Sequence, residues 1–498
     1  MEYTVEVTNF GKIKQAKIKI NDLTVFAGTN NTGKSYVSRL LYSIFSAITS
    51  NPEIDYQKRL VKELYLNLKR ENSRFSRSFG MDREWRKYDM ESSGKLFRLQ
   101  RKIDSDFAKT LDDSDLLITA DNSTEIIAKQ ILEEFEVLID EFQSDVKTII
   151  AKLIDQEVKS SAKKTLDKRL KVYSEALDKH LIKFRKELNG GETHFIEQEY
   201  KNKFNDNLIE NFQAEELKDL IGNNKNKSST IQITSSDGDA ISLNISKSGE
   251  IDKVSVDVID HEVYSDIVYL ESPIYWKLRS ALTTDVFHYN RRMRRERLAD
   301  VPKYFYDLIE KMRERRITAK NDAKIRDTLS QEIKNIIGGH IIEDKNSGEL
   351  LFVENSGSKT KTTSKKGISL HITATGVSQL GMIAHLIDKK IIRQGTILFL
   401  DEPEAHLHPA WQDKMMEILY GFTKYGVQVI MATHSPMMIQ RLELSTKQDK
   451  SPSKVSLNYF NRDGEFDSIA QAPDKISDAI NNSLESPAYK TYLKSLVM

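Results

Sequence analysis

The sequence of 498 residues contains no cysteine. This absence excludes disulfide bonds, cysteine nucleophiles and cysteine-bound zinc, and it fits a protein that works in a reducing compartment. Prolines number only nine, while hydrophobic residues make up 39% and charged residues 30% of the chain. This balance is typical of a helix-rich globular protein with two or three domains, and it argues against a disordered chain.

Long apolar runs are also missing, and so is an excess of charge of one sign. No stretch of 18 apolar residues occurs, and the N-terminus lacks a basic region followed by an apolar run, so we expect a cytoplasmic protein that does not enter a membrane. Lys plus Arg (75) nearly balances Asp plus Glu (74), which leaves a net charge of +1. Binding to nucleic acid would therefore need a local basic patch.

Three segments are candidates for such a patch. Residues 291–297 and 311–316 are the densest basic clusters, and residues 359–366 are rich in lysine. These segments could contact a phosphate backbone or an acidic partner. The alternative is a set of solvated helix faces whose charges pair with nearby Asp and Glu.

Hydrophobic periodicity predicts an α/β fold with a large helical insertion. Short strands and a helix are expected in the N-terminal segment, long amphipathic helices follow, β-hairpins and a helical basic segment come next, and strand–helix alternation returns at the end. One apolar stripe in the insertion runs through Ile127, Ile131, Phe135, Leu138, Phe142, Val146, Ile149 and Leu153. The predicted segments are residues 1–51, 52–225, 226–275, 276–337 and 338–498.

The segment Gly28-Thr-Asn-Asn-Thr-Gly-Lys-Ser35 matches the pattern G-x-x-x-x-G-K-[ST] directly after a predicted strand and at the start of a helix. Its glycines let backbone N–H groups turn toward phosphate oxygens, and the helix N-terminus adds the positive end of its dipole. Lys34 would reach the β- and γ-phosphates, and Ser35 would bind Mg²⁺. The expected nucleotide-binding residues are Gly28, Asn30, Asn31, Thr32, Gly33, Lys34, Ser35 and Tyr36.

A second apolar strand, beginning at Ile397, delivers Asp401 and Glu402 to its C-terminal end, which is where α/β sheets bind ligands. Asp401 would hold Mg²⁺, and Glu402 would accept a proton from an attacking water. The next apolar strand ends in Thr433-His434-Ser435-Pro436, so His434 should emerge at the same edge as a contact to the γ-phosphate or to water.

These elements resemble the ABC-type ATPases of the SMC/RecF/OLD group, in particular the AAA15 and AAA21 families. The resemblance covers about residues 1–50 and 265–440, and it rests on the phosphate loop, on Asp-Glu-Pro-Glu-Ala-His-Leu-His-Pro after residue 400, and on Thr-His-Ser-Pro after residue 432. It implies an ATPase head with a mixed sheet, a parallel core and a β-hairpin lobe. The stretch around Glu271 resembles the region of the family's glutamine loop, and no glutamine is assigned to it.

The family also carries a signature segment that opens a helix before the acidic strand. Ala374-Thr375-Gly376 stands at that place, with Thr375 where the family usually has serine. The resemblance implies that Thr375 and Gly376 face the γ-phosphate of ATP bound by a second copy, so that the site is complete only in a homodimer or higher homo-oligomer. An ordinary helix cap is the alternative.

Many OLD-like relatives append a metal-dependent nuclease after the ATPase. The segment after His434 contains Asp463, Glu465 and Asp467 but no strand-borne Asp-x-Asp, so we expect no nuclease here and a separate effector protein. The nuclease-less ATPase subunits of bacterial anti-phage systems, PARIS-like or Septu-like, have this arrangement. The alternative function is a RecF-like DNA-binding repair clamp; a transporter subunit fits less well because of the helical insertion.

Overall fold

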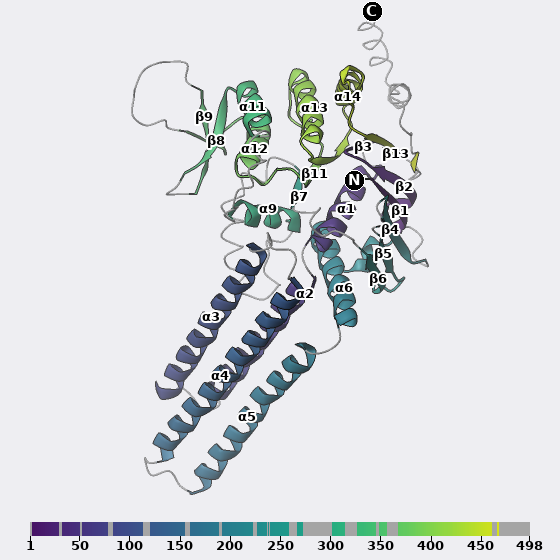
Figure 1. Ribbon diagram of the computed structural model, residues 1–498. Coiled ribbons are helices and arrows are strands. Elements are labelled where there is room, and N and C mark those ends of the chain that lie inside the picture. The colour runs from purple at the N-terminus through teal and green to yellow at the C-terminus, as the bar shows by residue number, and fades with distance from the viewer. Residues whose placement is uncertain are drawn as a thin grey trace, which may run out of the picture. The chain divides into compact units, whose positions relative to one another are not determined.

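The chain divides into two compact units, which we call the head (residues 1–49 and 201–498) and the helical unit (residues 50–200) (Figure 1). The computed structural model describes residues 2–28, 32–49, 52–77, 83–112, 120–154, 160–188, 192–222, 227–236, 238, 240–257, 266–271, 301–313, 326–344, 348–355, 367–460 and 466–467. Within these ranges, no helix combines the length and the apolar character that crossing a membrane would need.

The centre of the head is a six-stranded sheet in the order β14-β13-β3-β12-β11-β7. Five of its strands run parallel, and β14 pairs antiparallel at one edge. Its inner strands are buried on both faces, which explains their unbroken apolar sequences. The strands are β3 (Leu23–Gly28), β7 (Asp266–Leu270), β11 (Thr396–Asp401), β12 (Gln428–Thr433), β13 (Val455–Phe460) and β14 (Phe466–Asp467).

Helices cover this sheet and carry the head's apolar core. Helix α1 (Lys34–Ile48) packs against β3, β7, β11 and β12, and it buries the apolar stripe expected from the sequence. Helices α13 (Pro409–Lys424) and α14 (Pro436–Gln448) follow β11 and β12, and each begins with proline after a capping side chain. Three shorter helical elements are α9 (Lys303–Arg313), the π-helix Arg326–Ser330 and α11 (Gln331–Ile336).

Two antiparallel sheets complete the head. One has five strands in the order β2-β1-β4-β5-β6, and it joins the N-terminal hairpin to residues more than 200 positions later, because Val5 pairs with Ile233. Its strands are β1 (Tyr3–Phe10), β2 (Ile13–Ile20), β4 (Ser229–Ser235), β5 (Ala240–Ile245) and β6 (Ile251–Asp257). The other contains β8 (Gly339–Glu343), β9 (Leu350–Glu354) and β10 (Ile368–Ser369), and α12 (Thr375–Asp388) follows it.

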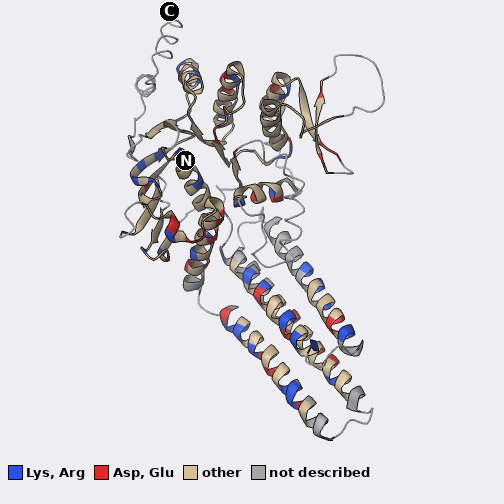
Figure 2. Ribbon diagram, turned by 180° about the vertical axis from the view of Figure 1, so that it is seen from behind, with Lys and Arg blue, Asp and Glu red and all other residues tan. Residues whose placement is uncertain are grey.

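Four long helices form the helical unit. They are α2 (Pro52–Arg77), α3 (Arg83–Asp112), α4 (Ala120–Ile154) and α5 (Ser160–Leu188), and α2 and α4 each pack against both α3 and α5. The predicted stripe on α4 is buried at Ile131, Phe135, Leu138, Phe142 and Val146. Lys, Arg, Asp and Glu are interspersed along the described parts of these helices (Figure 2), so charges of one sign do not form a long run.

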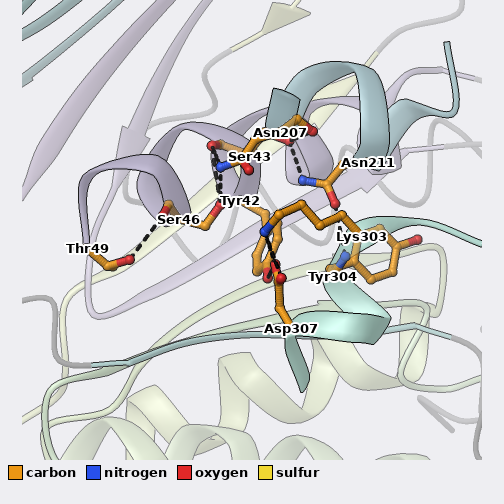
Figure 3. A network of polar contacts seen from close by, with 9 residues as sticks. All are labelled: Tyr42, Ser43, Ser46, Thr49, Asn207, Asn211, Lys303, Tyr304 and Asp307. Atoms are coloured by element: carbon orange, nitrogen blue, oxygen red, sulfur yellow. Dashed lines mark hydrogen bonds and ion pairs between the residues drawn. The ribbon is translucent and has the colours of Figure 1, made fainter. Parts of the chain in front are cut away.

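Helix α6 (Glu192–Phe212) and the short 3₁₀ helix Leu217–Leu220 lead back into the head. The sequence suggests that this stretch belongs to the insertion, but its asparagines bond to α1. Asn207 Nδ2 donates to the Ser43 carbonyl at 3.1 Å, and Asn211 Nδ2 donates to Ser43 Oγ at 3.0 Å (Figure 3). Asn211 also accepts from the Tyr304 backbone N–H at 3.0 Å, which ties α9 to the same network.

Taken with the parallel core and the β-hairpin lobe, this architecture confirms the predicted α/β fold class.

The basic clusters are described only in part. Residues 291–297, 314–316 and 359–366 lie outside the described residues. Lys311, at the start of the second cluster, lies 3.2 Å from the buried carboxylate of Asp266, which Arg393 also contacts at 3.0 Å. This lysine is therefore engaged inside the head.

Candidate functional site

The phosphate loop connects β3 to α1, as its motif predicts. Gly28 has φ 147° and Gly33 has φ 101°, a region of backbone conformation that side chains rarely allow. A methyl group on Gly28 would lie 2.6 Å from the Phe460 carbonyl oxygen, so the close approach of β13 also requires glycine there. Thr32 is buried beside this turn. Asn30 and Asn31 lie outside the described residues.

Lys34 folds back over the loop from the first turn of α1. Its side chain is buried, and Nζ donates a hydrogen bond to the Gly28 carbonyl at 3.0 Å. Burial lowers the pKa of Lys34, and the carboxylates of Glu402, Asp401 and Glu404 oppose this shift. The ammonium group therefore lies close to the acidic motif, in the position from which a lysine of this loop reaches phosphate.

Ser35 and Asp401 meet across 366 residues of sequence. Ser35 Oγ donates to Asp401 Oδ1 at 2.8 Å, and the Tyr269 hydroxyl lies 3.4 Å from Oδ2. Burial raises the pKa of Asp401 to about 6, partly against the Ser35 hydrogen bond and with a further upward contribution from Glu271. A buried carboxylate that is only partly compensated is a suitable ligand for a cation.

A hydroxyl beside one carboxylate fits Mg²⁺ in particular. Mg²⁺ in nucleotide sites is usually held by one or two carboxylates together with phosphate oxygens and water. Among the residues that the structure describes, no group of three or more His, Asp or Glu side chains could hold a metal ion by itself. The chain's own ligands would be Ser35 and Asp401.

Glu402 follows Asp401 in a strained backbone conformation. Its φ is 50°, in the left-handed region that costs about 1–3 kcal/mol for a residue with a side chain. The conformation is held from β12, because Glu402 N–H donates to the Ala432 carbonyl at 2.9 Å. The side chain of Glu402 remains 44% exposed. Strain that presents an accessible carboxylate at a sheet edge is a frequent feature of functional sites.

His434 emerges from the neighbouring strand and meets the same motif. Its Nδ1 lies 3.3 Å from Glu404 Oε1 and 3.6 Å from Glu402 Oε1. The parallel pairing of β11 with β12 produces this meeting, since Asp401 is in register with Ala432. We call Lys34, Ser35, Asp401, Glu402 and His434 the phosphate edge, because the sheet brings all five to the carboxyl ends of its strands.

The signature segment lies elsewhere in the head. Thr375 begins α12, and the cap residue Ala374 gives this N-terminus no side-chain hydrogen bond. A methyl group on Gly376 would lie 3.1 Å from the His406 carbonyl, and Gln379 Nε2 donates to the Pro403 carbonyl at 2.9 Å. Helix α12 therefore supports the loop after the acidic motif, while the Thr375 side chain forms no hydrogen bond within the described residues.

Tyr36 is positioned by packing. Its ring centroid lies 4.6 Å from that of Phe212 and 5.6 Å from that of Phe10, and burial raises the pKa of Tyr36 to about 12. Gly11, with φ 54°, leaves room for this ring. The side chain of Tyr36 is thus committed to the interface of α1 with the N-terminal hairpin, which leaves its backbone N–H as the group for any contact with phosphate.

Sequence analysis did not assign several polar side chains that surround the phosphate edge. Arg39 lies 2.7 Å from Glu271, and Glu271 also accepts a hydrogen bond from the Tyr304 hydroxyl. Glu404 accepts from Thr433 and from the His434 backbone. Arg39 is one helical turn after Ser35, and Glu404 belongs to the acidic motif. Their spacing from Ser35 and from Asp401 was the sequence feature that could have indicated a place near the site.

The strand, glycine loop and helix, with an acidic strand end and a histidine on adjacent parallel strands, define a phosphate-loop ATPase head. The chain belongs to the AAA_15 family of AAA ATPase domains, whose model matches residues 1–439. This confirms the resemblance drawn from the motifs, and the protein is an ATP-binding ATPase of that family.

Similarity to individual proteins is more limited. The Old nuclease of Escherichia phage P2 is 40% identical over 47 residues, which are 9% of this chain and 8% of that protein. An SMC head bound to the winged-helix domain of ScpA is 12% identical with a TM-score of 0.36, covering 94% of this chain and 97% of the other. RecF with a bound nucleotide is 10% identical with a TM-score of 0.27, covering 53% and 89%.

Proposed function

We propose that the phosphate edge of one copy and the signature segment of a second copy together bind and hydrolyse ATP to ADP and phosphate. The observation that carries this proposal is the contact of Ser35 with Asp401 at 2.8 Å, with Lys34 buried beside it. This contact brings the phosphate loop and the acidic motif together, and a bound Mg²⁺-nucleotide would need both motifs at the same place. When bound, Mg²⁺ neutralises charge on the phosphate oxygens.

The residues of the phosphate edge divide the work of hydrolysis. Lys34 and the N-terminus of α1 hold the β- and γ-phosphates, and Ser35 and Asp401 are the protein ligands of the cation. Glu402, exposed and held in its strained conformation, accepts the proton of the attacking water. His434 contacts that water or the γ-phosphate. Thr375 and Gly376 of the second copy bring a hydroxyl and a helix N-terminus to the other side of the nucleotide.

Substitution of the proposed base tests this mechanism. We expect Glu402→Gln to retain ATP binding, to lower the single-turnover hydrolysis rate by at least about 100-fold, and to accumulate the associated form in the presence of ATP. Glu417→Gln on α13 makes the same chemical change outside the site and should behave as wild type. Hydrolysis by Glu402→Gln at the wild-type rate would contradict the role of Glu402 as the base. A protein that stays monomeric at every ATP concentration would contradict the composite site.

At the level of the cell, we propose a cytoplasmic regulatory role in anti-phage defence, in which the ATPase senses an invader and holds or releases a separate effector such as a nuclease or toxin. The resemblance of the motifs to nuclease-less ATPase subunits of anti-phage systems supports this class of function, and the family supplies the ATPase. A test is affinity purification of the chain from cells that also express the product of the neighbouring gene, before and during infection. A nuclease that leaves the complex during infection is the expected result.

The alternative, a RecF-like clamp, differs in what it binds directly. It requires DNA affinity that falls steeply with salt, because each phosphate contact releases counterions. Within the described residues the start of the second basic cluster is engaged in the head, since Lys311 contacts Asp266. Salt-dependent DNA binding that disappears when Arg291, Arg292, Arg294 and Arg295 are changed to Glu would favour the clamp over the defence role.

A further inference from the structure

Glu404 is the most deeply buried carboxylate of the acidic motif, with a side chain 4% exposed. Two hydrogen bonds and one ring nitrogen converge on one of its oxygens. Thr433 Oγ1 donates to Oε1 at 2.7 Å, the His434 backbone N–H donates to it at 2.8 Å, and His434 Nδ1 lies 3.3 Å from it. A carboxylate oxygen accepts such hydrogen bonds through its lone pairs.

The second oxygen of the same carboxylate is unusual. Oε2 is buried and has no hydrogen-bond partner within the described residues. An unpaired buried polar atom costs about 1–3 kcal/mol, and packing alone would favour an apolar residue at this place. The polar contacts of this carboxylate are therefore concentrated at its other oxygen, which lies beside the His434 ring.

The position of this oxygen bears on the orientation of the His434 imidazole ring. The backbone bond fixes the start of the His434 side chain, and Nδ1 faces two carboxylates, Glu404 at 3.3 Å and Glu402 at 3.6 Å. A nitrogen between two carboxylate oxygens is favoured as a donor, so the proton of the neutral ring belongs on Nδ1. The other ring nitrogen, Nε2, is then the one left for the nucleotide and its attacking water.

We propose that Glu404 is the positioning residue of His434, which fixes both the direction of the imidazole and the tautomer with hydrogen on Nδ1. This inference rests on the proposed function, since it concerns the same ATP site. In this role Glu404 itself would contact neither the nucleotide nor the attacking water. It acts through His434, in the way that buried carboxylates orient catalytic or metal-binding histidines through the ring nitrogen opposite the working one.

The first test is a double-mutant cycle between Glu404→Gln and His434→Ala, measured as steady-state ATP hydrolysis. Glutamine retains an oxygen that accepts from Thr433 and from the His434 backbone, but it removes the negative charge at Nδ1. We expect Glu404→Gln to lower kcat about 10- to 100-fold with KM for ATP within about two-fold, as for other groups that act through a catalytic neighbour. In the His434→Ala background the same change should have almost no further effect.

Two outcomes would overturn the proposal: an unchanged kcat for Glu404→Gln, or an equal loss with and without the imidazole, which would show that Glu404 acts elsewhere. Glu417→Gln is the matched control and should retain wild-type kcat. Failure of the proposed function is distinguishable, because Lys34→Ala and Glu402→Gln would then hydrolyse ATP as the wild type does, whatever Glu404 does.

The second test needs no variant of Glu404 and is therefore independent of whether that variant folds. In the ¹⁵N spectrum of the histidine-labelled full-length protein, the signals of His434 are assigned by their loss in His434→Gln. We expect a protonated Nδ1 in the protein without nucleotide. A neutral ring with hydrogen on Nε2 and a bare Nδ1 would contradict the proposal.

Discussion

At the phosphate edge, Ser35 contacts Asp401, and Lys34 bonds to the Gly28 carbonyl of the phosphate loop. At the start of α12, by contrast, the Thr375 side chain forms no hydrogen bond within the described residues. Both regions belong to one head and both follow from short motifs. The first is organised by contacts within its own chain, and the Ala374 cap gives the second no side-chain hydrogen bond. The difference teaches that the phosphate edge is organised by contacts within one chain, whereas the contacts proposed above for the signature segment would come from a second copy.

The largest effect is expected at the assembled side. Lys34→Ala removes the buried ammonium group beside the acidic motif, and we expect ATP hydrolysis to fall by at least about 100- to 1,000-fold, as on loss of other preorganised charges. Steady-state ATPase assays measure this loss. Lys14→Ala, on the exposed face of β2, is the control. Comparable losses in both variants would mean that general destabilisation, rather than the site, is responsible.

The next prediction tests whether the two regions complete each other across copies. Thr375→Val should reduce hydrolysis in homo-oligomers because the hydroxyl is lost, and Lys34→Ala should abolish it. In an equimolar, freely exchanging mixture, half of the dimers pair the two variants and contain one intact site, so the rate should recover to about one quarter of wild type. Rates are measured before and after mixing. A mixture no faster than the average of its components would contradict a composite site.

Much of the phosphate edge was predictable because its motifs are local. The glycines, Lys34 and Ser35 lie within eight residues of one another, and the apolar strand before Asp401 shows which sheet edge it occupies. The fold class followed from the same alternation of strands and helices. These features depend on spacing along the chain, and the structure confirms the fold that they imply.

Long-range polar contacts were not predictable. Glu404 meets His434 only because β11 and β12 pair in one particular register, and Arg39 meets Glu271 across 232 residues. The asparagines of α6 bond to α1, yet on sequence that helix resembles the rest of the insertion. A single sequence specifies which side chains are buried more directly than which distant partners satisfy them, because many pairings give the same hydrophobic pattern.

A smaller effect concerns stability, and it has opposite signs in the two regions. Burial raises the pKa of Asp401 to about 6, so this residue contributes stability at low pH that is lost as pH rises through about 6. Asp401→Asn avoids that loss. At pH 7.5, without nucleotide or Mg²⁺, we expect the variant to unfold at a temperature a few degrees higher, from about 3 kcal/mol of relieved burial.

Binding of Mg²⁺ and nucleotide should reverse this order of melting temperatures. Mg²⁺ with a nonhydrolysable ATP analogue should raise the melting temperature of the wild type and leave Asp401→Asn nearly unchanged, because the variant lacks the carboxylate that would bind the cation. Thermal unfolding at pH 4 is the internal control, since the wild-type carboxyl is then largely protonated and the two proteins should converge. A variant less stable than wild type at pH 7.5 without ligand would show that the Ser35 contact outweighs burial.

His385 on α12 gives the opposite dependence and the smallest effect. Burial lowers the pKa of His385 to about 4, with Lys389 adding to the shift, and its Nδ1 lies 3.3 Å from the Ile341 carbonyl. The neutral ring therefore contributes stability above the usual pKa of about 6.5 that is lost as pH falls toward 4. His385→Gln should flatten acid destabilisation in that window, whereas His371→Gln, at an exposed position before the same helix, should not. Asp401 has the opposite dependence over part of this range, so the two contributions partly cancel in the wild type. Between pH 4 and 6.5 the melting temperature of Asp401→Asn/His385→Gln should therefore depend on pH less than that of either single variant. A change in slope equal to the sum of the two single changes would indicate that Asp401 and His385 titrate independently, and a non-additive change would reveal coupling between them.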